Sequence, residues 1–186
     1  ATFAWTNSNS TIGLAASGTG NTPSFAATNN TTLPEIATVT VNPTANGCPG
    51  SAASYTITVN PTPVVVVTPS TASFCNGGFT NLVATGADNY LWSPATGLDN
   101  TTTGTVTASP VITTTYTVTG IYYGCENETT VTITVFPNPV VAFQASDTAG
   151  CKPLCVDFSN QTTIASGTIT SWLWDFGDGE GSNLAS

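Results

Sequence analysis

The chain has 186 residues, of which ten are acidic and one, Lys152, is basic, and it has no histidine. Its net charge of -9 argues against nucleic acids and anionic membranes as partners, because both are bound through clusters of lysine and arginine. Without histidine, neither a Ser-His-Asp nor a Cys-His catalytic site can be assembled from this chain. We therefore expect a protein that is not an enzyme and has no catalytic residue.

The rest of the composition favours β-structure. The chain is 40% hydrophobic and only 6% charged, a combination unlike that of disordered segments. Its polar residues are mainly threonine, serine and asparagine, and the β-branched threonine side chain suits a half-buried pleated surface. The longest apolar run, residues 64–67, is far too short for a membrane-spanning helix, so we expect no direct membrane insertion.

Strict alternation of apolar residues with threonine recurs along the chain. It occurs in residues 37–41 (ATVTV), 55–59 (YTITV), 115–119 (TYTVT) and 131–135 (VTITV). A period of two places the apolar residues on one face, which predicts antiparallel strands with the other face in water. The fold class is therefore predicted to be all-β.

Two proline-containing stretches predict where one domain ends and the next begins. Residues 59–63 (VNPTP) and 135–139 (VFPNP) each follow an alternating strand and contain two prolines. Such a run cannot continue a central strand, so each is interpreted as a stiff connector. The predicted domains are residues 1–61, 62–137 and 138–186.

Each predicted domain has one tryptophan in an apolar strand before a turn: Trp5, Trp92 and Trp174. They recur at intervals of roughly 85 residues, about the size of a seven-stranded β-sandwich. We interpret this as an internal repeat in which each tryptophan fills the core of its own sandwich. If each marks the third strand of a sandwich, the first and last copies are incomplete.

Two explanations for the incomplete copies remain open. The chain is either an excerpt of a long repeat array, or half-domains of neighbouring chains complete one another by strand addition. The excerpt is preferred, since repeat arrays often contain many copies.

An acidic loop follows Trp174. Asp175, Asp178 and Glu180 alternate with glycines and are candidate ligands of Ca²⁺, which binds oxygen atoms. The spacing does not match an EF-hand loop. The glycines also suit a tight hairpin, in which an aspartate side chain bonds the amides of its own turn. We prefer the hairpin, so no cofactor is required and calcium is the alternative.

Several segments resemble known domain families. Residues 172–179 (WLWDFGDG) resemble the signature of the PKD domain, an Ig-like β-sandwich, and residues 150–162 (GCKPLCVDFSNQT) resemble its first two strands. The middle segment, from NYLWSPATGLDN to TTTYTVTGIYYGCENETTVTITV, resembles Ig-like repeats of very large surface proteins from gliding bacteria. Residues 3–20 and 39–61 resemble a related PKD-like repeat.

The resemblance implies an extracellular or cell-surface protein, exported by the type IX route, whose tandem Ig-like and PKD-like sandwiches form a rod, filament or adhesive surface. Its partners would be neighbouring repeats or copies of itself, and surface glycans. The alternative is a spacer or carbohydrate-binding module of a secreted polysaccharide-degrading enzyme. For that role the adjacent Tyr122 and Tyr123 are the visible aromatic candidates, although alternation predicts that they point to opposite faces.

Five cysteines are predicted to form disulfides in such a secreted chain. We pair Cys75 with Cys125, although their loops could lie at opposite ends of the sandwich, and Cys151 with Cys155. Cys48 follows Asn-Gly as Cys125 follows Tyr-Gly, so its partner is expected upstream of residue 1. Residues 147–149 (DTA) resemble an O-glycosylation motif of gliding bacteria, which would place a sugar on Thr148; an ordinary exposed loop is the alternative.

Overall fold

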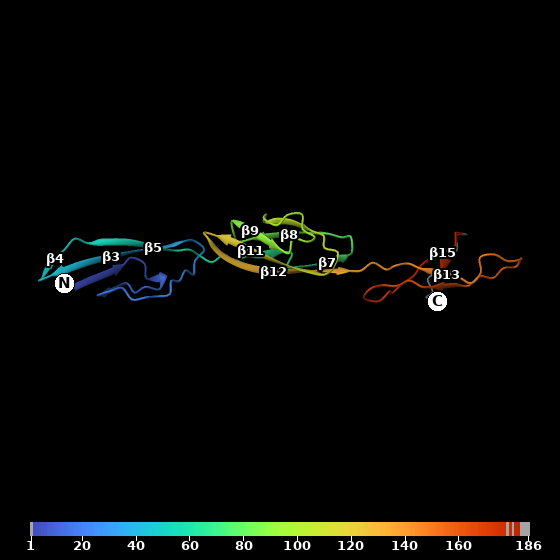
Figure 1. Cartoon of the computed structure of the whole chain (residues 1–186), viewed down its shortest axis with the longest axis horizontal. Coiled ribbons are helices and arrows are strands. Elements are labelled where there is room, and N and C mark those ends of the chain that lie inside the picture. The colour runs from blue at the N-terminus through green and yellow to red at the C-terminus, as the bar shows by residue number, and fades with distance from the viewer. Residues whose placement is uncertain (1, 178, 180, 183–186) are drawn as a thin grey trace.

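The computed structural model describes residues 2–177, 179, 181 and 182. The prediction of an all-β chain is confirmed, since these residues form strands, one short 3-10 turn and no α-helix. Strands pair within three stretches, which we call unit 1 (residues 2–59), unit 2 (66–136) and unit 3 (143–182). The units follow one another along the long axis of the molecule (Figure 1). The limits of 1–61, 62–137 and 138–186 as independent domains remain a prediction.

Unit 1 is a single sheet covered by a long loop. Its elements are β1 (Thr2–Asn7), η1 (Ser10–Ile12), β2 (Ser17–Thr19), β3 (Glu35–Ala45), β4 (Cys48–Pro49) and β5 (Ala53–Val59). The strand order is β2-β1-β3, and both β4 and β5 pair with β3. Ile12 and Leu14, from the loop that follows β1, pack with Trp5, Ala37 and Val39 to form the core.

Unit 2 contains two sheets that share one core. Its strands are β6 (Val66–Thr68), β7 (Thr71–Cys75), β8 (Thr80–Thr85), β9 (Asn89–Ser93), β10 (Thr105–Ala108), β11 (Thr114–Tyr122) and β12 (Cys125–Phe136). One sheet has the order β10-β8-β6 and the other β7-β12-β11-β9. Strand β7 runs parallel to β12, while the other pairs are antiparallel. The core includes Leu82 from the first sheet, and Trp92 and Tyr116 from the second.

Unit 3 has two small sheets and an aromatic cluster between them. Strand β13 (Phe143–Ala145) pairs with β14 (Phe158–Asn160), and β15 (Trp174–Asp175) pairs with β16 (Gly181–Ser182). The rings of Phe143, Phe158, Trp174 and Phe176 contact one another at centroid distances between 5.5 and 6.3 Å. Of these side chains, Phe143, Phe158 and Phe176 are 59%, 37% and 48% exposed.

The four alternating segments all form strands, as predicted. They lie in β3, β5, β11 and β12, and in β11 and β12 the alternate residues Tyr116, Val118, Val131 and Ile133 are fully buried. The threonines between them point away from the core, and Thr115 and Thr132 are joined by a hydrogen bond of 2.9 Å on that face. The period of two in the sequence therefore decided which face is buried.

Units 1 and 2 each contain a long hairpin closed by the same kind of turn. Asn46-Gly47 joins β3 to β4, and Tyr123-Gly124 joins β11 to β12. All four residues have positive φ, at 51°, 81°, 48° and 80° respectively, which is the geometry of a type I′ turn. This turn places Cys48 and Cys125 at the same position, the first residue of the returning strand.

The buried hydroxyl of Tyr116 makes the stability of unit 2 sensitive to alkaline pH. It donates to the backbone oxygen of Thr96 at 2.8 Å, and burial raises the pKa of Tyr116 above its ordinary value. A group whose pKa is higher in the folded state than in the unfolded state stabilises the folded state when it is protonated. This stabilisation is fully present at pH values below the pKa in the unfolded chain, and it is lost as the pH rises through the pKa in the folded protein. We expect the free energy of unfolding of unit 2 to fall above about pH 10.

Tyr116→Phe tests this expectation. The variant should lose about 0.5–1.5 kcal/mol at neutral pH, because the hydrogen bond is gone. It should also show a smaller loss between neutral and alkaline pH in urea titrations that follow unit 2. If Tyr116→Phe loses as much free energy of unfolding at alkaline pH as the unchanged chain does, the pH dependence comes from another tyrosine.

Candidate interaction surfaces

Trp5 and Trp92 occupy matching positions in their sheets. Trp5 pairs with Val41 and Trp92 with Val118, in each case on the strand that enters the long hairpin. Both indole rings are buried in the cores of their units. The Trp92 Nε1–H donates to the backbone oxygen of Thr103 at 2.9 Å, whereas Trp5 Nε1 has no partner among the described residues.

Trp174 is less deeply buried than Trp5 and Trp92. It is partly buried, and its ring contacts Phe143 edge-on at 5.6 Å and stacks on Phe176 at 6.3 Å. The three phenylalanines of this cluster were not identified as a group from the sequence, because they lie on separate strands or loops with no common spacing. Together with Val141, Ile169 and Trp172 they line an open apolar cleft of about 580 Å³.

The predicted disulfide between Cys75 and Cys125 is wrong. Cys75 pairs with Phe136 at the last position of β12, while Cys125 is the first residue of the same strand. At about 3.3 Å per residue, the two cysteines are roughly 35 Å apart, far beyond the reach of a disulfide. Cys151 and Cys155 are exposed and also unbonded, and Cys48 is free, so the structure contains neither predicted disulfide.

The acidic loop is described only in part. The Asp175 carboxylate accepts a hydrogen bond of 2.9 Å from the Gly177 backbone N–H, as expected for a turn. Asp178 and Glu180, the other candidate calcium ligands, lie outside the described residues. Within the described part of the chain, no three acidic, cysteine or histidine side chains gather as a metal site would require. Thr148, the candidate glycosylation residue, is exposed between β13 and β14.

The expectation that Tyr122 and Tyr123 point to opposite faces is wrong. Their ring centroids are 4.5 Å apart at an interplanar angle of 67°, an edge-on contact. Tyr123 lies in the hairpin turn with positive φ, so the alternation of the strand has already ended there. Burial raises the pKa of Tyr122, with smaller contributions from Tyr123 and Asp88. The crossed rings do not form the flat row that a sugar-binding platform needs.

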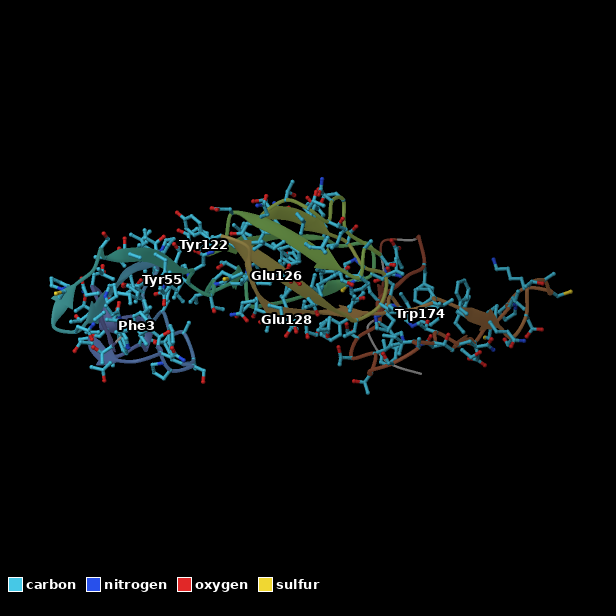
Figure 2. The ribbon with its side chains drawn as sticks, turned by 60° about the vertical axis from the view of Figure 1, so that its left-hand side comes forward. Phe3, Tyr55, Tyr122, Glu126, Glu128 and Trp174 are labelled. Atoms are coloured by element: carbon cyan, nitrogen blue, oxygen red, sulfur yellow. The ribbon has the colours of Figure 1, made fainter. Side chains whose placement is uncertain are left out.

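The connectors between units are held by asparagine side chains. Asn60 Nδ2 donates to the Tyr123 backbone oxygen at 2.8 Å, and Asn127 Nδ2 donates to the Pro63 oxygen at 2.9 Å. Between units 2 and 3, Asn138 Nδ2 donates to the Asn76 oxygen at 3.0 Å. Pro61 is fully buried at the first junction. Figure 2 shows Tyr122 beside this junction. These contacts were not predicted, because asparagine next to proline also occurs in unconstrained turns.

We expect Asn127→Asp to loosen the first junction, because it replaces the donor to the Pro63 oxygen with a carboxylate that repels that oxygen. The rotational correlation times of units 1 and 2, measured by ¹⁵N relaxation, should then differ more than in the unchanged chain. Asn42→Asp is the matched control, since Asn42 is exposed on β3 and the charge change is identical. Equal correlation times in the two variants would contradict a role for Asn127 in holding the junction.

The same pairing registers occur in more than one unit. In unit 1 Val39 pairs with Tyr55, and in unit 2 Tyr116 pairs with Val131. Together with the tryptophan pairs, this shows that β1, β3 and β5 are arranged as β9, β11 and β12 are. In unit 3, β13 and β14 form an antiparallel pair, as β6 and β8 do in unit 2.

Comparison with known proteins identifies no family for this chain. No family model matches the chain, and no curated protein matches it. Among solved structures it is similar to the crystal structure of the S-layer protein rSbsC(31-844), with 13% sequence identity and a TM-score of 0.28. The match covers 99% of this chain and 32% of that one, so the chain spans about a third of that protein's length. A likeness this weak supports neither a fold nor a function.

Proposed function

We propose that the chain is a segment of a bacterial surface protein in which Ig-like and PKD-like β-sandwich repeats form an extracellular rod or adhesive filament. The observation that carries the proposal is the single row in which the three units follow one another (Figure 1). A row of small units separates whatever lies at its two ends, which is what a stalk or spacer does.

The repeated pairing registers support the repeat interpretation. Tandem copies of one sandwich would give equal registers around equivalent tryptophans, as at Trp5 and Trp92. In unit 2 the parallel strand β7 beside β12, and the three-stranded sheet β10-β8-β6 across the core, are the arrangement expected of an Ig-like sandwich.

The connectors support a rod rather than a flexible string. Asparagine side chains hold both junctions, and the first junction also buries Pro61. The surface is suited to an exposed extracellular position, because the chain has no arginine and its one lysine, Lys152, precedes Pro153, a bond that trypsin-like proteases cleave poorly. In the described part of the chain, no helix has the length and apolar character needed to cross a membrane.

Two measurements test this function. Small-angle X-ray scattering should give a radius of gyration well above the roughly 16 Å of a compact domain of this length. Antibodies against the chain, applied to intact cells of the source organism, should label the outer surface before permeabilisation. Label that appears only after permeabilisation would overturn the surface role, whatever the shape.

The carbohydrate-binding alternative gains no support from the tyrosine pair, whose rings are crossed rather than coplanar. A glycan array probed with the chain and with Tyr123→Ala would decide it. Retention that disappears in the variant would favour the binding module over the rod.

A further inference from the structure

A cleft lies at the junction between units 1 and 2. Its volume is about 550 Å³, which is within the range of small-molecule binding sites. Residues 29–32 line it from unit 1, residues 86–88 and Tyr122 line it from unit 2, and residues 61–64 of the connector complete the lining. Figure 2 shows Tyr122 where the two units meet, away from both ends of the row.

Hydrogen bonds fix the backbone of the cleft on the side of unit 1. Asn29 Nδ2 donates to the backbone oxygens of Leu33 and Val59 at 2.8 and 2.7 Å, which ties the loop to the last residue of β5. The Thr31 backbone N–H donates to Asn29 Oδ1 at 2.8 Å. The loop of residues 29–33 is therefore held in one conformation by its own side chains.

The loop of unit 2 on the other side of the cleft is anchored as well. The Tyr90 hydroxyl donates to the Ala87 backbone oxygen at 2.8 Å and accepts from the Ala87 N–H at 3.0 Å. The Asp88 N–H donates to the Ile121 backbone oxygen at 3.1 Å. With both loops fixed in the free protein, a ligand would bind here without the cost of ordering them.

Several polar side chains of the lining are free to bind a ligand. Among the described residues, the side chains of Asn30, Thr32, Thr62 and Asp88 have no hydrogen-bond partner. The carboxylate can only accept hydrogen bonds, whereas the amide and the hydroxyls can both donate and accept them. Burial is the main cause of the raised pKa of Tyr122, and the charge of Asp88 adds to it, so the carboxylate lies close to this ring.

We propose, on the basis of the proposed surface function, that this cleft binds a neutral sugar of an uncharged surface polysaccharide. A sugar ring has C–H groups on its two faces and hydroxyl groups around its edge. The faces match the Tyr122 ring and the buried Pro61 and Pro63, while the hydroxyls donate to Asp88 and bond with Asn30. A cleft encloses its ligand, so one aromatic ring is enough and no flat row of rings is needed.

The charge of the cleft favours a neutral sugar over an acidic one. Asp88 is the one charged residue of the lining, and the single base of the chain, Lys152, belongs to unit 3. An acidic sugar would be repelled by Asp88, with no cation in the lining to offset the repulsion. The hydroxyls of a neutral sugar meet no such penalty.

Titration of the full chain with sugars, followed by NMR amide signals, tests the proposal. The neutral probes are maltose, cellobiose, lactose and N,N′-diacetylchitobiose, and the acidic probe is glucuronic acid. At least one neutral probe should shift the signals of residues 30–32, 62 and 86–88 together, and the rotational correlation times of units 1 and 2 should approach each other, because the sugar contacts both. An equal response to glucuronic acid, or no response to any sugar, would overturn the assignment.

Variants on the two sides of the cleft locate the site. Asp88→Asn should weaken binding at least about tenfold and Asn30→Ala about two- to tenfold, because each removes a hydrogen-bond partner of the sugar. Glu126→Gln and Asn42→Ala are the matched controls, since both residues are exposed and lie outside the lining. They should bind as the unchanged chain does. Unchanged affinity in Asp88→Asn and Asn30→Ala would overturn the site.

The outcome is independent of the tests of the rod. Tyr123 does not line the cleft, so sugar retention through the cleft should persist in Tyr123→Ala, whereas a platform made of the tyrosine pair would lose it. A chain that binds none of the sugars would still give the scattering and surface labelling expected of a rod. Labelling only after permeabilisation would instead overturn the surface function, whatever the cleft binds.

Discussion

Trp92→Ala is expected to lower the free energy of unfolding of unit 2 by about 3–5 kcal/mol, enough to unfold it in part under ordinary conditions. The indole is buried between the two sheets, in the same core as Leu82, Tyr116 and Ile133. Its removal leaves a cavity that these neighbours can fill only partly, since they belong to strands fixed by their own hydrogen bonds. Urea denaturation followed by NMR signals of unit 2 would measure the loss.

The two buried tryptophans provide a matched comparison. Both Trp92→Phe and Trp5→Phe shrink an aromatic side chain, but only Trp92 donates a hydrogen bond, to the Thr103 oxygen. We expect Trp92→Phe to cost more than Trp5→Phe by about 1–3 kcal/mol, the penalty for leaving a polar group without its partner. An equal cost for the two would mean that water replaces the indole at Thr103.

Local patterns in the sequence predicted the strands well. Alternation of threonine with valine or isoleucine decides both the period and the buried face, so β3, β5, β11 and β12 could be placed from the sequence alone. The burial of Trp5 and Trp92 follows from the same argument, because each lies in an apolar strand that precedes a turn.

Features that depend on distant parts of the chain were not predictable in this way. The error at Cys75 and Cys125 arose because the parallel pairing of β7 with β12 joins segments about sixty residues apart, and no local signal gives its direction. The contact of Tyr122 with Tyr123 depends on one positive φ in a turn, which alternation does not describe.

Gly86→Ala is expected to be among the most damaging single changes in the chain, although it adds only a methyl group. Gly86 follows β8 with φ of +95°, and a Cβ built there would lie 1.9 Å from the Val64 backbone oxygen. No rotation of a side chain relieves a contact with backbone, so the stretch that carries Val65 into the core must move. Over-packing of this kind typically costs about 1–3 kcal/mol or more.

Gly77 separates the steric cost from the cost of backbone strain. It has the same φ of +95°, but nothing lies within 4 Å of the position of its Cβ. Gly77→Ala should therefore lower the free energy of unfolding by about 1–2 kcal/mol, the cost of an alanine in the left-handed conformation. Gly86→Ala should lower it by this amount and by the further cost of the clash with Val64.

Val65 also packs over Gly120, where a Cβ would lie 2.5 Å from the Val65 side chain, so a displaced Val65 disturbs the sheet of β11. Amide exchange should consequently quicken in both sheets of unit 2 in Gly86→Ala, and only around the β7–β8 turn in Gly77→Ala. Equal losses of stability in the two variants would show that the backbone at Val64 moves away from the added methyl group without destabilising unit 2. Only the left-handed backbone conformation would then matter at these glycines.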